Sequence, residues 1–139
     1  MLSRGKFVTY LRVWLLFLAA IELPAIWEQL SPGSDGLPFK GVNSNLHAGR
    51  AQRRLWALVL GCLVAARVAA AAAPTHSIVL AHNASVHCLE ALYVGAEFLS
   101  GADDSGFITA IVMANAALFA GAAVWLPAGS PADKAGHRS

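Results

Sequence analysis

Four long apolar windows constrain the fold of this chain more than any other feature of its sequence. They cover residues 7–27, 55–73, 77–99 and 107–126. A helix that crosses the hydrocarbon core of a bilayer needs about 20 mostly apolar residues, and each window has about that length. None of them alternates polar and apolar residues as the strands of a membrane barrel do. The sequence therefore predicts an all-α, polytopic membrane protein with four transmembrane helices.

The connections between the windows predict how these helices are arranged. Residues 74–76 and 100–106 are short, and short connections place consecutive helices antiparallel. Residues 28–54 are expected to form a polar loop, and residues 127–139 a disordered tail. The expected architecture is one domain, residues 1–126, folded as an up-down antiparallel bundle with both termini on one side of the membrane. Lys and Arg are shared evenly between the two sides, so the positive-inside rule assigns no orientation.

Composition and motifs exclude several classes of function. Charged residues make up only 13% of the chain, against about 25% in soluble domains, which argues against a water-soluble domain. A net charge of +2 is too small for a nucleic-acid-binding surface. Cys62 and Cys88 lack the spacing of metal ligands or of a disulfide framework. His82 and His87 lie about 140° apart on a helix, so they cannot bind one metal or haem iron from the same face. No phosphate-binding loop or nucleophile elbow is present. We therefore expect no cofactor, no metal and no self-contained catalytic apparatus.

Ionisable residues inside the windows need an explanation, because a charge in the bilayer costs a few kcal/mol unless it is paired or faces the bundle interior. These residues are Arg12, Glu22, Arg67, His82, His87, Glu90 and Glu97. At 100° per residue, a stripe about 80° wide on the third predicted helix holds four polar residues, namely Asn83, His87, Glu90 and Glu97. This polar face is predicted to point into the bundle or at a partner protein.

Depth matching predicts which of these residues meet. If the second and third helices pair about their short turn, residues whose numbers sum to about 150 lie at the same depth. Arg67 then lies level with Asn83 and within reach of His87. Glu22 and Glu90 both come out near mid-depth, where each is expected to be protonated unless an arginine or a histidine lies close.

The same rule places Glu97 level with Arg53 and Arg54, which predicts an interfacial ion pair that fixes helix register. Arg12 and Arg67 can alternatively extend toward the side of the chain termini. His87 beside Glu90 could form a proton-transfer pair for general acid–base catalysis.

Small residues spaced four apart allow helices to approach closely, as at Ala91/Gly95 and Ala117/Gly121. Such packing serves either the bundle itself or contacts with other proteins.

The first window resembles the opening of a known family. Its pattern Phe7-x-x-x-Leu11-Arg12-x-Trp14-Leu15 is similar to the start of the ergosterol biosynthetic protein 28 family, four-span proteins of the endoplasmic reticulum of about this length.

Later parts of the chain extend the resemblance. Arg54-Leu55-Trp56 stands where the family has an Arg-Thr-Phe-Gly-x-Trp block, and the different spacing leaves open which arginine of residues 50–54 is equivalent. Arg67 and Glu97 resemble an arginine of the family's second span and a glutamate of its third, and Tyr93 stands where the family often has a histidine.

The resemblance implies a non-catalytic membrane scaffold. Members of that family tether the sterol C-4 demethylation enzymes, namely the methyl oxidase, the C-3 dehydrogenase/decarboxylase and the 3-keto reductase, at the endoplasmic reticulum membrane. It implies these enzymes as partners in sterol and ergosterol biosynthesis, within the lipid bilayer, with sterol contacts and a homo-oligomer left open. The candidate residues for partner contact or helix packing are Arg12, Trp14, Arg54, Trp56, Arg67, Asn83, His87, Glu90 and Glu97.

Two alternatives remain open. One is a small intramembrane sterol-modifying enzyme, isomerase-like, in which His87 and Glu90 transfer protons. The other is a subunit of an unrelated transporter or respiratory complex, which would have a different set of partners.

Overall fold

A computed structural model describes residues 3–31, 50–101 and 106–127 of the chain. Side chains are described from residue 53 onward in the second of these ranges. Most of the predicted polar loop, residues 32–49, and nearly all of the predicted tail, residues 128–139, lie outside the described residues.

The described residues form four helices and no strand, which confirms the all-α prediction. The helices are α1 (Arg4–Leu30), α3 (Arg50–Ala72), α4 (Ser77–Leu99) and α5 (Gly106–Trp125). At the start of α1, Ser3 accepts a hydrogen bond from the backbone N–H of Lys6 at 3.4 Å, as an N-cap does. After α4 the chain turns through Gly101, whose φ of 73° is in the left-handed region that favours glycine.

Two helices extend into residues 28–54, the segment predicted to be a polar loop. Residues 28–30 belong to α1, and residues 50–54 belong to α3. The segments consist mainly of Glu, Gln, Leu, Ala and Arg, which are strong helix formers even where they are too polar for the bilayer. The apolar windows therefore marked the apolar parts of these helices and not their ends.

Three helices are long and apolar enough to cross a membrane: Arg4–Leu30, Arg53–Ala72 and Gly106–Trp125. Helix α4 has 23 residues but is not one of the three. Polar residues, among them Asn83, His87 and Glu90, interrupt its apolar sequence. The chain thus has the helices of a membrane protein, and the role of α4 depends on where its polar residues lie.

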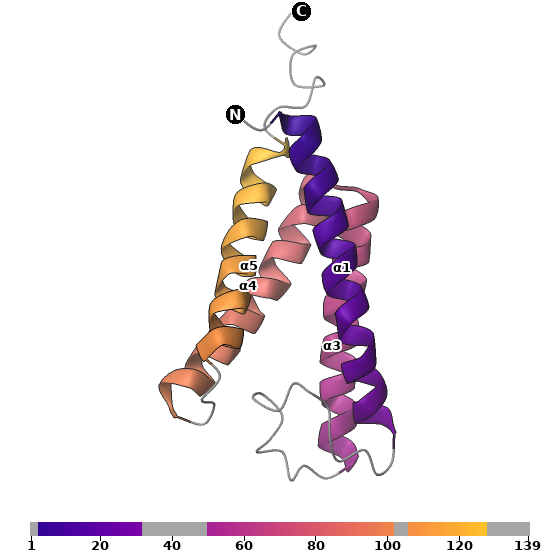
Figure 1. The fold of residues 1–139 in the computed structure, drawn as a ribbon, viewed down its shortest axis with the longest axis vertical. Coiled ribbons are helices and arrows are strands. Elements are labelled where there is room, and N and C mark those ends of the chain that lie inside the picture. Colours follow the sequence, from indigo (N-terminus) through magenta and orange to yellow (C-terminus); the bar gives the residue numbers. More distant parts are fainter. Residues whose placement is uncertain (1–2, 32–49, 102–105, 128–139) are drawn as a thin grey trace, which may run out of the picture.

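The helices are arranged as two hairpins (Figure 1). In the first, the start of α1 lies beside the end of α3, where Arg12 Nε donates to the carbonyl oxygen of Ala71 at 2.9 Å. At its other end, Arg53 Nη2 donates to the carbonyl oxygens of Glu28 at 2.6 Å and Ser31 at 3.1 Å. Helices α4 and α5 form the second hairpin, which the short turn at residues 73–76 joins to the first.

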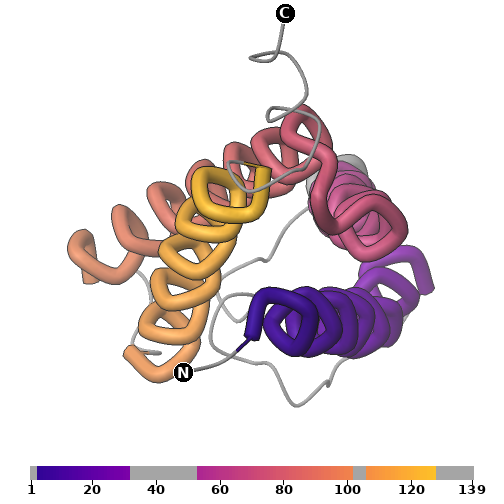
Figure 2. Tube along the Cα trace, turned by 90° about the horizontal axis from the view of Figure 1, so that it is seen from above, coloured from indigo at the N-terminus to yellow at the C-terminus, as the bar shows by residue number. Residues whose placement is uncertain are grey.

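The four helices share a hydrophobic core at one end of the molecule. The core residues come from the first half of α1, the end of α3, the start of α4 and the end of α5 with the turn that follows it: Leu11, Leu15, Leu18, Ala70, Ala71, Leu80, Ala84, Phe119, Ala122 and Leu126. Alanines on three of the helices allow this close approach. Away from this core the two hairpins diverge (Figures 1 and 2). The sequence predicted a bundle but not this difference between its two ends.

The two pairs of small residues have different environments. Ala91 is buried, and Gly95 lies against α5, since a Cβ on Gly95 would be 2.6 Å from Met113 Cε. Ala117 and Gly121 are exposed, and a Cβ on Gly121 would meet nothing within 4 Å. The first pair therefore packs the α4–α5 hairpin, whereas the second lies on its outer surface.

Candidate functional site

A buried charge cluster joins the two hairpins. Its centre is Arg67 of α3, whose side chain is 3% exposed. The guanidinium forms an ion pair with Glu22 of α1, and its Nη2 lies 3.7 Å from Glu90 Oε2 of α4. Its Nε donates to His87 Nε2 of α4 at 2.7 Å. We call Glu22, Arg67, His87 and Glu90 the central charge cluster. It links α1, α3 and α4 through one side chain.

Arg67 lies on the face of α3 that packs against the other helices. Leu63 and Ala70, one turn to either side, are 3% and 0% exposed. The alternative that Arg67 extends toward the chain termini is therefore wrong for this structure. Two carboxyl groups and an imidazole lie within reach of its guanidinium. A guanidinium that binds several partners at its own depth is stabilised more than one that must extend to the membrane interface.

His87 is held on both of its ring nitrogens. Its side chain is 0% exposed, and Nδ1 lies 2.7 Å from the carbonyl oxygen of Asn83, one turn earlier in α4. Nε2 accepts the hydrogen bond from Arg67, so the hydrogen must be on Nδ1 and the ring must be neutral. The ring packs edge-on against Phe119 of α5, with centroids 4.6 Å apart. Neither nitrogen is left for a substrate.

The charges of the cluster do not balance if both carboxyl groups are ionised. Glu22 and Glu90 are 16% and 19% exposed, and one guanidinium lies between them. A charge buried away from water needs a partner of opposite sign, and Arg67 supplies only one. Among the described residues, Glu22 Oε2 and Asn83 Oδ1 are also buried oxygens that accept no hydrogen bond.

A second polar contact links the hairpins through α1 and α5. Trp14 Nε1 donates to Asn115 Oδ1 at 3.0 Å, and Asn115 is 7% exposed. Trp14 was a sequence candidate, but Asn115 was not. The sequence feature that could have identified Asn115 is its carboxamide in an apolar span, because such a group must find a hydrogen-bond partner inside the protein.

The structure brings together the sequence candidates Arg67, His87 and Glu90, with Asn83 beside them. The predicted proximity of Arg67 to His87 is confirmed. Glu22 was recognised as an ionisable residue at mid-depth but was not among the candidate residues. Depth matching relates the second predicted helix to the third, and it does not tell which side of α1 faces α3.

The predicted ion pair of Glu97 with Arg53 or Arg54 is wrong. In the described part of the chain, Glu97 pairs with neither arginine, and the Arg53 guanidinium instead binds two carbonyl oxygens at the end of α1. The carbonyl oxygens at the end of a helix carry partial negative charge, so they attract a nearby arginine.

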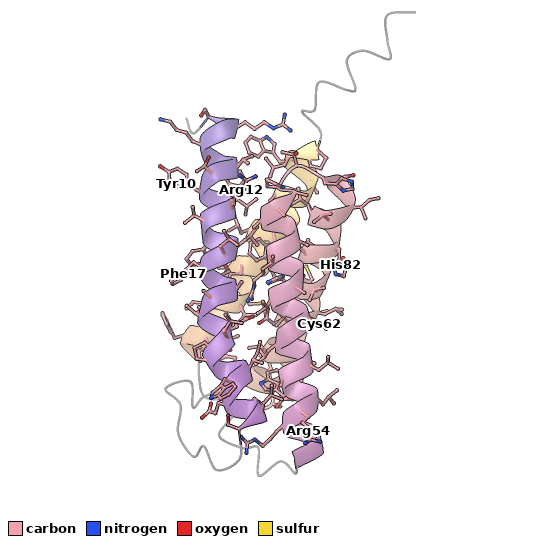
Figure 3. The ribbon with its side chains drawn as sticks, turned by 90° about the vertical axis from the view of Figure 1, so that its right-hand side faces the viewer. Tyr10, Arg12, Phe17, Arg54, Cys62 and His82 are labelled. Carbon is pink, nitrogen blue, oxygen red and sulfur yellow. The ribbon has the colours of Figure 1, made fainter. Side chains whose placement is uncertain are left out.

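The remaining sequence candidates lie away from the cluster. Arg54 is exposed, and Trp56 is half-buried, with its ring 5.9 Å from that of Tyr93 on α4. Figure 3 shows Arg12 reaching from α1 toward α3, whereas His82 and Cys62 lie on the outer surface. Within the described ranges, no group of three or more His, Cys, Asp or Glu residues could hold a metal ion.

Comparison with known proteins adds no relative: no family model, no curated protein and no solved structure matches the chain.

Proposed function

We propose that this chain is a multi-pass protein of the endoplasmic reticulum membrane and a non-catalytic scaffold for the sterol C-4 demethylation enzymes. In this proposal all four helices cross the bilayer in antiparallel order, with both termini on one side. The methyl oxidase, the C-3 dehydrogenase/decarboxylase and the 3-keto reductase bind to its surface within the membrane.

The burial pattern of α4 supports its role as a fourth span. Its polar residues Asn83 and His87 are 1% and 0% exposed, whereas Ile78, Leu89 and Leu92 on its outer surface are 67% to 73% exposed. Polar residues that face the bundle interior are tolerated in a membrane helix, and apolar residues suit the lipid side. Helix α4 can therefore lie in the bilayer although polar residues interrupt its apolar sequence.

The observation that favours a scaffold over an enzyme is that both ring nitrogens of His87 bind groups of the protein itself. A general acid or base needs a nitrogen that can reach the reacting atom. Both nitrogens of His87 are engaged by Arg67 and by the carbonyl oxygen of Asn83, and the ring has no exposed surface. The ionisable residues of the cluster thus hold helices together.

The assignment to sterol synthesis is carried by the resemblance of residues 7–15, of Arg67 and of Glu97 to the ergosterol biosynthetic protein 28 family. Two charged candidates remain for contact with partners. Arg54 is exposed and Glu97 is half-buried, at the end where the hairpins diverge. The exposed small residues Ala117 and Gly121 offer a surface on which a partner helix can pack closely.

A glycosylation reporter fused to each terminus in turn tests the number of spans. Four spans place both reporters on the same side, so both are modified or neither is. Three spans place them on opposite sides, and modification of only one reporter would refute the four-span arrangement. A reporter inserted in residues 32–49 is the internal control, since four spans place this segment on the side opposite the termini.

The partner proposal is tested by purifying the tagged protein in a mild detergent and identifying the proteins that accompany it. The sterol profile of cells that lack the protein is measured in parallel. We expect recovery of C-4 demethylation enzymes and accumulation of 4-methyl sterols. Their absence together with an unchanged sterol profile would refute the proposal and favour a subunit of an unrelated complex.

Matched variants distinguish a partner surface from the fold. Arg54→Ala is expected to weaken recovery of the enzymes, whereas Lys6→Ala removes an exposed positive charge at the opposite end and should leave recovery unchanged. Glu90→Gln separates scaffold from enzyme. Loss of sterol turnover with full recovery of the partners would support the intramembrane enzyme.

A further inference from the structure

We infer that the central charge cluster is a proton-binding site and that Glu90 carries the proton. In this arrangement Glu22 and Arg67 form the ion pair, and Glu90 is a neutral carboxylic acid beside them. The inference rests on the placement of these helices in a membrane, and it is independent of the sterol enzymes proposed as partners.

The charged and titratable groups around Glu90 come from three helices. Helix α3 contributes Arg67, helix α1 contributes Glu22, and α4 itself contributes His87, which is neutral because Nε2 accepts from Arg67. Helix α5, Gly106–Trp125, has no titratable side chain. One positive charge therefore faces two carboxyl groups. A second carboxylate would be an uncompensated charge in a medium of low dielectric, which is more costly than retention of one proton.

The contacts of Arg67 identify which carboxyl group keeps the proton. Glu22 is in direct contact with Arg67 Nη1, whereas Glu90 Oε2 is 3.7 Å from Nη2, beyond the length of a direct hydrogen bond. The guanidinium stabilises the closer carboxylate more strongly, so Glu22 is ionised and Glu90 is protonated.

This proton helps to hold the two hairpins together. Glu22 and Arg67 belong to the first hairpin, and Glu90 belongs to the second. Loss of the proton would place two carboxylates around one guanidinium, and their repulsion would oppose contact between α4 and the first hairpin. Since the folded protein binds a proton here that the unfolded chain releases near neutral pH, stability should fall as the pH rises.

Infrared difference spectroscopy of the purified full chain tests the inference directly. The protein is studied near neutral pH in a detergent free of ester and carboxyl groups, which would absorb in the same region. The spectrum of the protein minus that of Glu90→Gln should show the C=O stretch of one protonated carboxylic acid, shifted in deuterium oxide. Glu97→Gln on the same helix is the control, and its difference spectrum should show carboxylate bands only. Carboxylate bands in the Glu90→Gln difference spectrum would overturn the inference.

A second variant locates the proton without relying on the first. In Glu22→Gln, Glu90 becomes the remaining counter-ion of Arg67, so the acid band should disappear and the thermal midpoint should fall. In Glu90→Gln, which has the shape of the protonated acid, the midpoint should stay near that of the original protein and should not fall with rising pH. A midpoint that falls in Glu90→Gln but is kept in Glu22→Gln would place the proton on Glu22 and overturn the inference. None of these measurements depends on a partner protein.

Discussion

Replacement of Arg67 by methionine should destabilise the protein more than any other single removal of a charge. Arg67 is 3% exposed and provides the positive charge that faces Glu22 and Glu90. Methionine fills similar volume but cannot bind a carboxylate or donate to His87. The variant therefore leaves Glu22 buried without a counter-ion and His87 Nε2 without a donor.

The size of the effect follows from these contacts. Removal of one partner of a buried ion pair costs about 3–5 kcal/mol, because the other partner is left as an uncompensated charge. Glu22 can take up a proton in the variant, which places the expected cost near the lower limit, at about 3 kcal/mol. Domains of this size have total stabilities of about 5–15 kcal/mol, so the loss is a substantial part of the whole.

The measurement is reversible unfolding in mixed micelles, followed by far-ultraviolet circular dichroism as the fraction of denaturing detergent is raised. Arg54→Met is the matched control, because Arg54 is exposed and the same chemical change should cost less than about 0.5 kcal/mol there. The double variant Arg67→Met with Glu22→Gln removes both charges of the ion pair. It should recover more than half of the lost stability, because a pair that is removed as a whole leaves no unpaired charge.

Two results would refute this reasoning. The first is a cost for Arg67→Met no larger than that of Arg54→Met, which would mean that the cluster does not hold the hairpins together. The second is a double variant that is less stable than either single variant, which would mean that Glu22 and Arg67 act independently.

Further predictions concern helix contacts and are tested in the same unfolding assay. Trp14→Phe removes the donor to buried Asn115 and should cost about 1–3 kcal/mol, with no loss if that hydrogen bond is absent in solution. Gly95→Ala should cost less than about 1 kcal/mol because the flexible end of Met113 can move, whereas Gly95→Leu should cost about 1–3 kcal/mol through overpacking. Gly61→Ala should stabilise α3 by about 0.5–1 kcal/mol, because a Cβ there meets nothing within 4 Å; a loss of stability would reveal a contact that this structure lacks.

The sequence alone determined the helices and the depth of their polar residues. The apolar windows located all four helices, since twenty apolar residues in a row suit a bilayer-spanning helix and little else. The constant rise per residue, together with the short turn at residues 74–76, placed Arg67 level with Asn83 and near His87. Where the windows were bounded by polar residues that favour helix, as at residues 28–30 and 50–54, hydropathy gave the edge of the apolar region and not the end of the helix.

Only the tertiary structure decided which groups at the same depth actually meet. Depth fixes one coordinate, whereas a contact also requires that two helices face each other, and this depends on packing between segments far apart in the sequence. For this reason the sequence did not show that Glu22 is the direct partner of Arg67, or that Trp14 binds Asn115 across 101 positions of the chain. It also could not weigh competing partners, so it paired Glu97 with Arg53 or Arg54, whereas the Arg53 guanidinium binds two carbonyl oxygens at the end of α1.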